Sequence, residues 1–277
     1  MIDSYLFIPA SEKKFIKKST NLKNLDYRVF DLEDSVSEEL LSTAIKNISK
    51  INFSNNDWVR IPINIDYQIN LIENISKMGM NNFIIPKIKG YEDFKNIYSE
   101  ILKINSNAKI ILLIENAKIY VELEKILDDF EDNIYGLSLG IHDFTFETNM
   151  KNDYRVLTNI RTKILLLARS YEVEPIDVVS MYLKDEEKLR NEIVDGFNLG
   201  YRSKFIIHPK QLEILNSVKF YSFKKIKEYK DVLKHYNSTV DYKDSLFSYN
   251  DIVYEKMHIQ KIKKIVDWGE KFYKKYL

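Results

Sequence analysis

The run Ile110-Ile111-Leu112-Leu113-Ile114, followed at once by Glu115 and Asn116, is the stretch that decides the fold. A short, continuous apolar run of this kind is typical of a parallel strand that is buried on both faces. Phe83-Ile84-Ile85 is a second such run. The sequence therefore predicts parallel strands with helices packed over them.

Strand-like segments alternate with longer amphipathic stretches along most of the chain. The predicted strands are Ser4–Pro9, Tyr27–Asp31, Trp58–Ile63, Asn82–Pro86, Ile110–Ile114, Tyr135–Leu139, Ile176–Met181 and Lys204–Ile207, and the helical stretches include Glu12–Asn24, Ser37–Lys50, Tyr91–Ile104 and Arg155–Tyr171. Eight strands, each followed by a helix, predict a (β/α)8 TIM barrel with right-handed crossovers. The alternative, an open doubly wound sheet, normally has a Gly-rich turn after its first strand. Pro9-Ala10-Ser11-Glu12 is not such a turn.

The alternation stops after Ser217. Two helices are predicted over Lys219–Tyr236 and His258–Tyr276, with a polar loop over Asn237–Asn250 between them. We therefore predict a catalytic barrel domain over residues 1–217 and a C-terminal helical extension over residues 218–277, which we expect to pack on a neighbouring subunit. The extension holds 14 Lys against 8 Asp or Glu. This excess fits either an acidic partner or a solvated appendage.

Composition excludes several classes of protein. The 277 residues are 45% hydrophobic and 30% charged with a net charge of +1, so neither a nucleic-acid nor a membrane partner is predicted. The chain has no cysteine, which excludes disulfides, thiolate metal sites and a cysteine nucleophile. The first strand-like run begins at Ser4, which leaves no room for a signal peptide. No apolar run is long enough to span a bilayer, and a cytoplasmic location is predicted.

Polar residues lie within or directly after six of the eight predicted strands. They are Asp31-Leu32-Glu33-Asp34, Arg60, Lys87, Glu115-Asn116, Gly140-Ile141-His142-Asp143 and His208-Pro209. In a barrel of this type the carboxyl ends of all strands meet at one rim, where active sites are built. The sequence therefore predicts a site at this rim.

Glu115 and Asp143 are the strongest candidates for metal ligands. They would end neighbouring strands, close enough to share one ion. Mg²⁺ prefers oxygen ligands and commonly binds one or two protein carboxylates, which leaves positions for water and substrate. Alternatively, Glu115 caps the next helix and Asp143 pairs with Arg60 or Lys87.

Arg60 and Lys87 are candidates for substrate binding. The planar guanidinium of Arg60 can hold a substrate carboxylate with two hydrogen bonds, or it can form a salt bridge with Asp31, Glu33 or Asp34. Lys87 can form a Schiff base or serve as a charge partner for the acidic residues.

Two histidines and one serine motif complete the set of candidates. His142 and His208 are either general bases or structural hydrogen-bonding residues. Gly136-Leu137-Ser138-Leu139-Gly140 matches the Gly-x-Ser-x-Gly pattern of serine hydrolases. That pattern needs a sharp turn after the serine, whereas the apolar strand here continues through Ser138. The serine hydrolase interpretation is therefore disfavoured.

These segments together resemble the citrate lyase β-subunit-like branch of the HpcH/HpaI aldolase superfamily. The resemblance runs from Tyr5 to about Asn216 and rests on Ser4-Tyr5-Leu6-Phe7-Ile8-Pro9, Phe30-Asp31-Leu32-Glu33-Asp34-Ser35-Val36, Val59-Arg60-Ile61-Pro62-Ile63-Asn64, Ile85-Pro86-Lys87, Leu113-Ile114-Glu115-Asn116-Ala117, Leu139-Gly140-Ile141-His142-Asp143-Phe144, Pro175-Ile176-Asp177 and Lys204-Phe205-Ile206-Ile207-His208-Pro209-Lys210-Gln211. It implies a metal-dependent barrel, trimeric or hexameric, that makes or breaks carbon–carbon bonds next to a carboxylate or thioester.

The resemblance also implies roles for individual residues. Glu115 and Asp143 correspond to the ligands of Mg²⁺, with Mn²⁺ as an alternative ion. Arg60 corresponds to the arginine that binds the substrate carboxylate and stabilises the enolate. Glu33 and Asp34 correspond to supporting acids near the metal. Lys87 and His142 are added here as further substrate-binding candidates.

Two departures from the family pattern affect these expectations. Asp3 and Pro9-Ala10 stand where family members usually have an arginine and Pro-Gly, in a region that helps to receive coenzyme A. CoA is expected only as part of a substrate, and this departure argues against a CoA substrate. In the family's tail an aspartate in a Val-Asp-x-Pro pattern acts in a neighbouring subunit's site. Tyr254 takes its place in the best match, with Asp251 or Glu255 as possible substitutes.

The sequence therefore predicts a Mg²⁺-dependent carbon–carbon lyase of the aldol or Claisen type. Its substrate is expected to be a small hydroxy or oxo carboxylate or the acyl-CoA thioester of one. The alternatives are an acyl-CoA thioesterase or condensing enzyme on the same barrel, and a catalytically impaired homologue that binds metal and acid.

Overall fold

The computed structural model describes residues 2–62, 68–239 and 246–273. The chain divides into two compact units, with the boundary between Val218 and Lys219. Each unit is described by itself below. Among the described residues no helix is long and apolar enough to cross a membrane.

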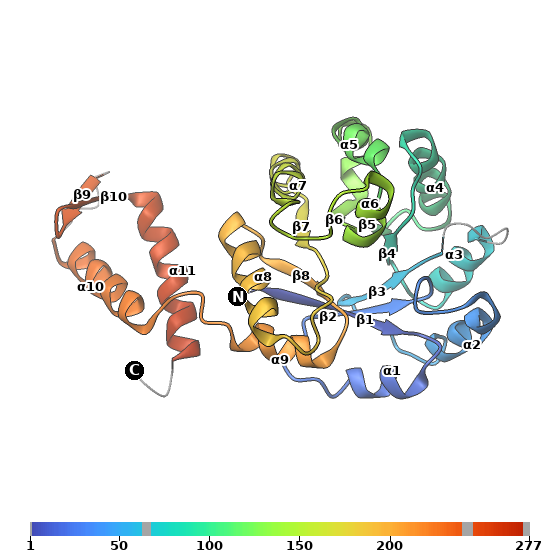
Figure 1. Ribbon diagram of the computed structural model, residues 1–277, viewed down its shortest axis with the longest axis horizontal. Coiled ribbons are helices and arrows are strands. Elements are labelled where there is room, and N and C mark those ends of the chain that lie inside the picture. The colour runs from blue at the N-terminus through green and yellow to red at the C-terminus, as the bar shows by residue number, and fades with distance from the viewer. Residues whose placement is uncertain (1, 63–67, 240–245, 274–277) are drawn as a thin grey trace. The chain divides into compact units, whose positions relative to one another are not determined.

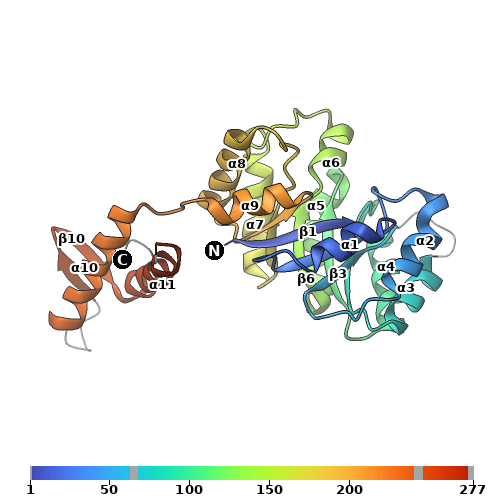
Figure 2. The same ribbon diagram turned by 90° about the horizontal axis from the view of Figure 1, so that it is seen from below.

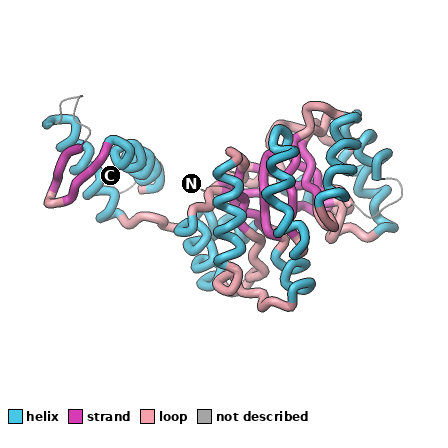
Figure 3. Tube along the Cα trace, turned by 90° about the horizontal axis from the view of Figure 1, so that it is seen from above, coloured by secondary structure: helices cyan, strands magenta, loops and turns pink. Residues whose placement is uncertain are grey.

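The first unit is a closed barrel of eight parallel strands in the order β1 to β8, which confirms the predicted (β/α)8 fold. The strands are β1 Asp3–Pro9, β2 Tyr27–Asp31, β3 Asp57–Arg60, β4 Asn82–Ile85, β5 Lys109–Ile114, β6 Ile134–Leu139, β7 Glu174–Asp177 and β8 Ser203–Ile206. Figure 1 shows them at the centre of a ring of helices, and in Figure 3 the magenta strands lie between the cyan helices. The first and last strands pair with each other, and this pairing closes the barrel.

Helices connect consecutive strands on the outside of the barrel. They are α1 Lys13–Ser19, α2 Glu38–Ile48, α3 Gln68–Lys77, α4 Tyr91–Ile104, α5 Ala117–Phe130 with the 3-10 turn Glu131–Asn133, α6 Ile141–Thr148, α7 Thr158–Ser170, α8 Glu186–Leu199 and α9 Pro209–Ser217. The connection between β6 and β7 holds two helices, α6 and α7. The short helix α6 begins directly after β6, at the carboxyl end of the barrel.

Two apolar layers follow from the alternation of side chains along each strand. One layer lies between strands and helices and includes Leu112, Ile114, Leu137 and Leu139. The other fills the barrel interior with Tyr5, Val29, Trp58, Ile84, Ile111, Leu113, Ile176 and Phe205. The next inward position after Val29 is Asp31, after Trp58 it is Arg60, and after Leu113 it is Glu115. Because side chains alternate along each strand, these charged residues also point inward, and they lie at the mouth of the barrel.

Strand β7 differs from its prediction. It covers Glu174–Asp177 rather than Ile176–Met181. The residues that follow are outside the sheet, and side chains satisfy two of their carbonyls: Lys204 Nζ donates to Val178 O at 2.6 Å, and Gln211 Nε2 donates to Ser180 O at 2.7 Å. Strand β3 ends at Arg60, and Ile63, the last residue of its predicted range, lies outside the described residues.

The second unit contains α10 Phe223–Thr239, β9 Leu246–Tyr249, β10 Ile252–Glu255 and α11 Lys256–Phe272. In Figure 2 the two helices are seen beside the β9–β10 hairpin. The predicted polar loop over Asn237–Asn250 is wrong at its two ends, which belong to α10 and β9, and its middle part, residues 240–245, lies outside the described residues. Asn250 and Asp251 join the strands with φ values of 49° and 62°, which is the backbone of a two-residue hairpin turn.

Candidate active site

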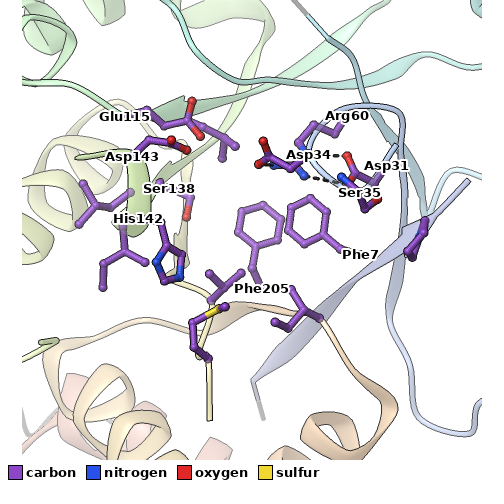
Figure 4. A pocket seen from close by; sticks show the side chains of 18 residues that line it. Phe7, Asp31, Asp34, Ser35, Arg60, Glu115, Ser138, His142, Asp143 and Phe205 are labelled. Carbon is purple, nitrogen blue, oxygen red and sulfur yellow. Dashed lines mark hydrogen bonds and ion pairs between the residues drawn. The ribbon is translucent and has the colours of Figure 1, made fainter. Parts of the chain in front are cut away.

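A pocket of about 370 Å³ opens at the carboxyl ends of the barrel strands. Most of its lining is apolar and includes Phe7, Leu113, Val179, Met181, Phe205 and Ile207. Its polar wall is made by Asp31, Asp34, Ser35, Arg60, Glu115, Ser138, His142 and Asp143. Figure 4 shows Glu115 and Asp143 on one side of this space, Arg60 with Asp31 and Asp34 on another, and the rings of Phe7 and Phe205 next to each other at the centre of the view. The predicted rim site is thus a real cavity.

Glu115 is held in a buried position just after β5. Only 6% of its surface is exposed, and it accepts a hydrogen bond from the backbone N–H of Lys87. A Cβ on Gly140 would lie 2.2 Å from Glu115 Cγ, so the absence of a side chain at position 140 gives Glu115 its space. Burial, reinforced by the negative charge of Asp143, raises the pKa of Glu115 to about 8. Asn116, and not Glu115, caps the following helix α5.

Asp143 comes from a different element, the first turn of α6. Its carboxylate faces that of Glu115 across the pocket wall (Figure 4). The two residues fit a divalent cation, because Mg²⁺ takes one or two carboxylates and completes its sphere with water and substrate oxygens. The raised pKa of Glu115 supports the same fit, since a cation would offset the cost of burying its charge. Among the described residues no group of three or more acids or histidines forms a full cage.

Arg60 is fixed on its neighbour in the sheet. Asp31 and Arg60 are register partners in β2 and β3, and Asp31 accepts from Nε at 2.7 Å and from Nη2 at 2.8 Å. Nη1 donates to Asp34 at 2.9 Å and lies 3.1 Å from Glu33. Burial lowers the pKa of Arg60, but the three acids outweigh this effect and raise it. The guanidinium also lies over the Phe7 ring, 4.8 Å from the centroid.

Glu33, Asp34 and Lys87 form a second set of ion pairs beside Arg60. Lys87 Nζ donates to Glu33 and, at 2.7 Å, to Asp34, and this pairing raises the pKa of Lys87 despite the opposing effect of burial. Asp34 lines the pocket, whereas Glu33 and Lys87 do not. Lys87 also has a φ of 53°, so its backbone turns sharply where it donates to Glu115. The ammonium of Lys87 is thus occupied by acids, and its backbone touches the proposed metal site.

The two histidines differ in position. His142 lines the pocket and its Nδ1 lies 2.8 Å from Asn152 Nδ2. His208 is the N-cap residue of α9, and its Nδ1 accepts from the backbone N–H of Lys210 at 3.0 Å. His208 therefore has a structural hydrogen bond, and only His142 faces the cavity.

Ser138 lies within β6, and the strand continues to Leu139. The sharp turn that a hydrolase nucleophile needs comes two residues later than the pattern requires, which agrees with the rejection of that motif. The serine is 1% exposed and lines the pocket.

Sequence reasoning missed two contributors to this site. Asp31 was considered only as a competitor for Arg60, but it also accepts from the backbone N–H groups of Glu33 and Ser35, and so shapes the turn that carries the acids. The apolar wall, with Val179 and Met181, comes from a segment that was predicted to be strand. Inward alternation from Val29 would have identified Asp31; no local pattern would have identified the wall.

The fold and the site define a (β/α)8 barrel protein with carboxylates and a buried arginine in a pocket at the carboxyl ends of its strands. The HpcH/HpaI aldolase/citrate lyase family model matches residues 3–209. The chain therefore belongs to this family, as its sequence motifs predicted.

Characterised relatives in this family carry out more than one reaction. The chain is 25% identical over 232 residues to a (3S)-malyl-CoA thioesterase of Cereibacter sphaeroides, a match that covers 78% of this chain and 76% of the relative. It is 24% identical over 239 residues to the citrate lyase subunit beta of Escherichia coli, with the same coverage. The family membership is thus shared by a lyase subunit and a thioesterase.

A solved structure shows the same fold. CitE from Mycobacterium tuberculosis, in complex with magnesium, acetoacetate and coenzyme A, matches with a TM-score of 0.80 and 20% identity, over 96% of this chain and 97% of that chain. At this level of identity the match concerns the fold.

Proposed function

We propose that the protein is a Mg²⁺-dependent carbon–carbon lyase that acts on a small hydroxy or oxo carboxylate, or on the acyl-CoA thioester of one. The observation that carries this proposal is the convergence of Glu115 and Asp143 on one pocket beside the buried Arg60. Family membership supports a lyase-type reaction. Bound by the two carboxylates, Mg²⁺ would supply a Lewis acid for the oxygen that becomes negatively charged when the bond breaks.

Arg60 would orient the substrate and stabilise its charge. Asp31 already occupies the edge of the guanidinium formed by Nε and Nη2. Nη1 is engaged by Asp34, whose side chain is 48% exposed, and it also lies 3.1 Å from the largely buried Glu33. A substrate carboxylate can replace Asp34 there while the pairs with Asp31 and Glu33 remain. This gives Arg60 a fixed orientation together with one exchangeable contact for a carboxylate oxygen.

The C-terminal unit is proposed to provide the general acid or base to a neighbouring subunit in a homotrimer or hexamer. Tyr254 is unsuited to this role, because it is buried in its own unit and stacks on Phe247 with ring centroids 5.2 Å apart. Glu255 is exposed and stands at the N-cap of α11, where its side chain is part of a capping box with His258. Glu255 is therefore our first candidate for the acid, with Asp251, which is also exposed, as the second.

Mixed oligomers test this assignment. Glu115→Gln and Glu255→Gln proteins should each be inactive alone. Unfolded and refolded together, they should regain part of the activity, because some sites combine an intact Glu115 with an intact Glu255 from another chain. No recovery in mixed oligomers, with each variant folded, would contradict a contribution between subunits.

A thioesterase is the second candidate, favoured by the (3S)-malyl-CoA thioesterase relative. Of the two departures in the first strand, Asp3 begins β1 at the far end of the barrel, and Pro9 lines the pocket. Only the Pro9-Ala10 departure therefore bears on whether the mouth receives a CoA thioester.

The test is a product assay with chelator-treated protein, with and without added Mg²⁺ or Mn²⁺. Free hydroxy and oxo acids and their CoA thioesters are offered in parallel. Carbon–carbon cleavage that needs the metal supports the lyase, release of free CoA with an intact carbon chain supports the thioesterase, and metal-dependent binding without turnover indicates an impaired homologue. Glu124→Gln, an exposed change on α5, serves as the control for Glu115→Gln.

A further inference from the structure

The inward face of β6 differs from those of the other strands at the mouth. The positions that point inward along its second half are Gly136, Ser138 and Gly140, so no large side chain stands over this part of the wall. A Cβ on Gly136 would meet Ile111 Cγ1 at 3.1 Å and Ile176 Cδ1 at 3.2 Å. Gly140 makes the same kind of room for Glu115. Ser138 is thus the sole inward side chain of this segment, between two glycines.

The hydroxyl of Ser138 is buried without a partner. Ser138 is 1% exposed, and its Oγ has no hydrogen-bond partner among the described residues. Leaving a buried polar atom without a partner costs free energy, so such atoms are rare and call for an explanation. Ser138 pairs in register with Leu113, two residues before Glu115, and lines the same pocket as Glu115 and Asp143.

We infer that Ser138 is a substrate-binding residue whose hydroxyl donates a hydrogen bond to an oxygen of the carboxylate ligand held at Glu115 and Asp143. This inference rests on the proposed function and adds a specificity-determining residue to it. The two glycines leave room for neighbouring side chains, Gly136 for Ile111 and Ile176 and Gly140 for Glu115. The Gly-x-Ser-x-Gly motif thereby has a role that needs no nucleophile: the glycines allow close packing of the wall, and the serine recognises an oxygen of the ligand.

Ser203 provides a matched control. It is also a strand serine that is 1% exposed, but its hydroxyl donates to Glu174 Oε1 at 2.7 Å. It begins β8, at the opposite end of the barrel from the pocket. Ser203→Ala removes a satisfied structural hydrogen bond, whereas Ser138→Ala removes a hydroxyl that is proposed to find its partner only in the ligand.

The experiment compares wild type, Ser138→Ala and Ser203→Ala by calorimetry with Mg²⁺ alone and with oxalate at saturating Mg²⁺, and by thermal unfolding in chelator. For Ser138→Ala we expect oxalate affinity to fall by about 10- to 100-fold, with Mg²⁺ binding unchanged and Tm equal to or above that of wild type. For Ser203→Ala we expect a lower Tm and unchanged oxalate affinity.

Three results would overturn the inference. Ser138→Ala could bind oxalate as wild type does, or lose Tm as Ser203→Ala does, which would indicate a structural hydroxyl. In either case the proposed function stands, because the wild type still binds oxalate with Mg²⁺. A wild type that binds no oxalate with Mg²⁺ would instead overturn the proposed function, and this inference with it.

Discussion

The barrel holds two clusters of charged side chains with opposite characters. The mouth cluster consists of Asp31, Glu33, Asp34, Glu115 and Asp143 with Arg60 and Lys87. The wall cluster consists of Asp177 and Asp195 with Arg161 and Lys204, on β7, β8, α7 and α8. The first has five acids for two bases, whereas the second pairs two acids with two bases, and the partly buried Glu192 lies beside it.

In the wall cluster the ions satisfy one another. Arg161 Nη2 donates to Asp177 at 2.8 Å and its Nη1 donates to Asp195 at 2.7 Å. Burial raises the pKa of Asp177, but Lys204 and Arg161 outweigh it and hold that pKa below its ordinary value. None of these four residues lines the pocket at the mouth.

In the mouth cluster burial raises the pKa of two acids, Glu33 and Glu115. Arg60 and Lys87 pair with Asp31, Glu33 and Asp34, and the pKa of Glu115 is raised to about 8. A buried charge is tolerated when it is paired, so the excess of acids at the mouth suits an added cation. The difference between the two clusters is that the acids of the mouth cluster outnumber its bases and face a cavity. Both features together indicate a binding site.

The largest expected effect is on stability, at the wall. Asp177→Asn leaves Arg161 and Lys204 without their buried partner and should lower the free energy of unfolding by about 3–5 kcal/mol. Urea unfolding followed by circular dichroism measures this change. Asp195→Asn should cost less, because the Asp195 side chain is 30% exposed. Equal losses for both would contradict the central position of Asp177.

At the mouth the corresponding change should affect chemistry and spare stability. Glu115→Gln removes a proposed metal ligand, and loss of one stabilising group of this kind typically lowers the rate on the order of 10²–10³-fold. Because the carboxyl is destabilised by burial, the metal-free variant should unfold at or above the wild-type temperature. Steady-state kinetics and a thermal melt in chelator test both parts. A marked loss of stability would place Glu115 with the structural ions.

Each of the two clusters has a glycine that packs against one of its acids: Gly140 against Glu115 at the mouth, and Gly196 against Asp177 in the wall. Gly140→Ala pushes on Glu115 and should weaken Mg²⁺ binding by about 10- to 100-fold, as changes beside a metal ligand do. Gly196→Ala pushes on Asp177, where a Cβ would lie 2.2 Å from Oδ2, and should lower Tm without changing Mg²⁺ affinity. Calorimetric titration of both folded variants with Mg²⁺ measures this difference. An unchanged Mg²⁺ affinity in Gly140→Ala would contradict the idea that Gly140 makes room for Glu115.

The last expected effect is a difference in pH dependence. The raised pKa of Glu115 means that the metal-free folded state binds its proton more tightly than the unfolded chain does. This contribution to stability is complete below the ordinary pKa of 4.5 and is lost as pH rises through about 8. The lowered pKa of Asp177 acts in the other direction, so its contribution is present above pH 3.8 and is lost as pH falls through the folded-state pKa. We therefore expect the free energy of unfolding of the wild type, measured in chelator, to fall between pH 5 and 8 relative to that of Glu115→Gln.

The sequence predicted only part of the mouth cluster. It indicated which acids lie at the rim, but not which charged groups pair with one another. Acids after strands two, five and six mark the rim because any barrel brings strand ends together. The ion pairs could not be assigned from the sequence. Arg60 could pair with Asp31, Glu33 or Asp34, because these three acids lie within a few residues of one another. The wall cluster escaped prediction entirely, since Arg161 and Asp195 lie on helices and nothing local indicates that they point at Asp177.

The sequence by itself determined the barrel, because short buried runs alternating with amphipathic helices have few other ways to bury their apolar faces. It also determined which residues reach the rim, because side chains alternate along a strand. Only the tertiary structure decided that Val178–Met181 leaves the sheet to wall the pocket, and that residues 246–255 form a hairpin. It alone decided that Ser138 lies in the pocket without a partner. Those outcomes depend on contacts between segments distant in the chain, which local preferences do not encode.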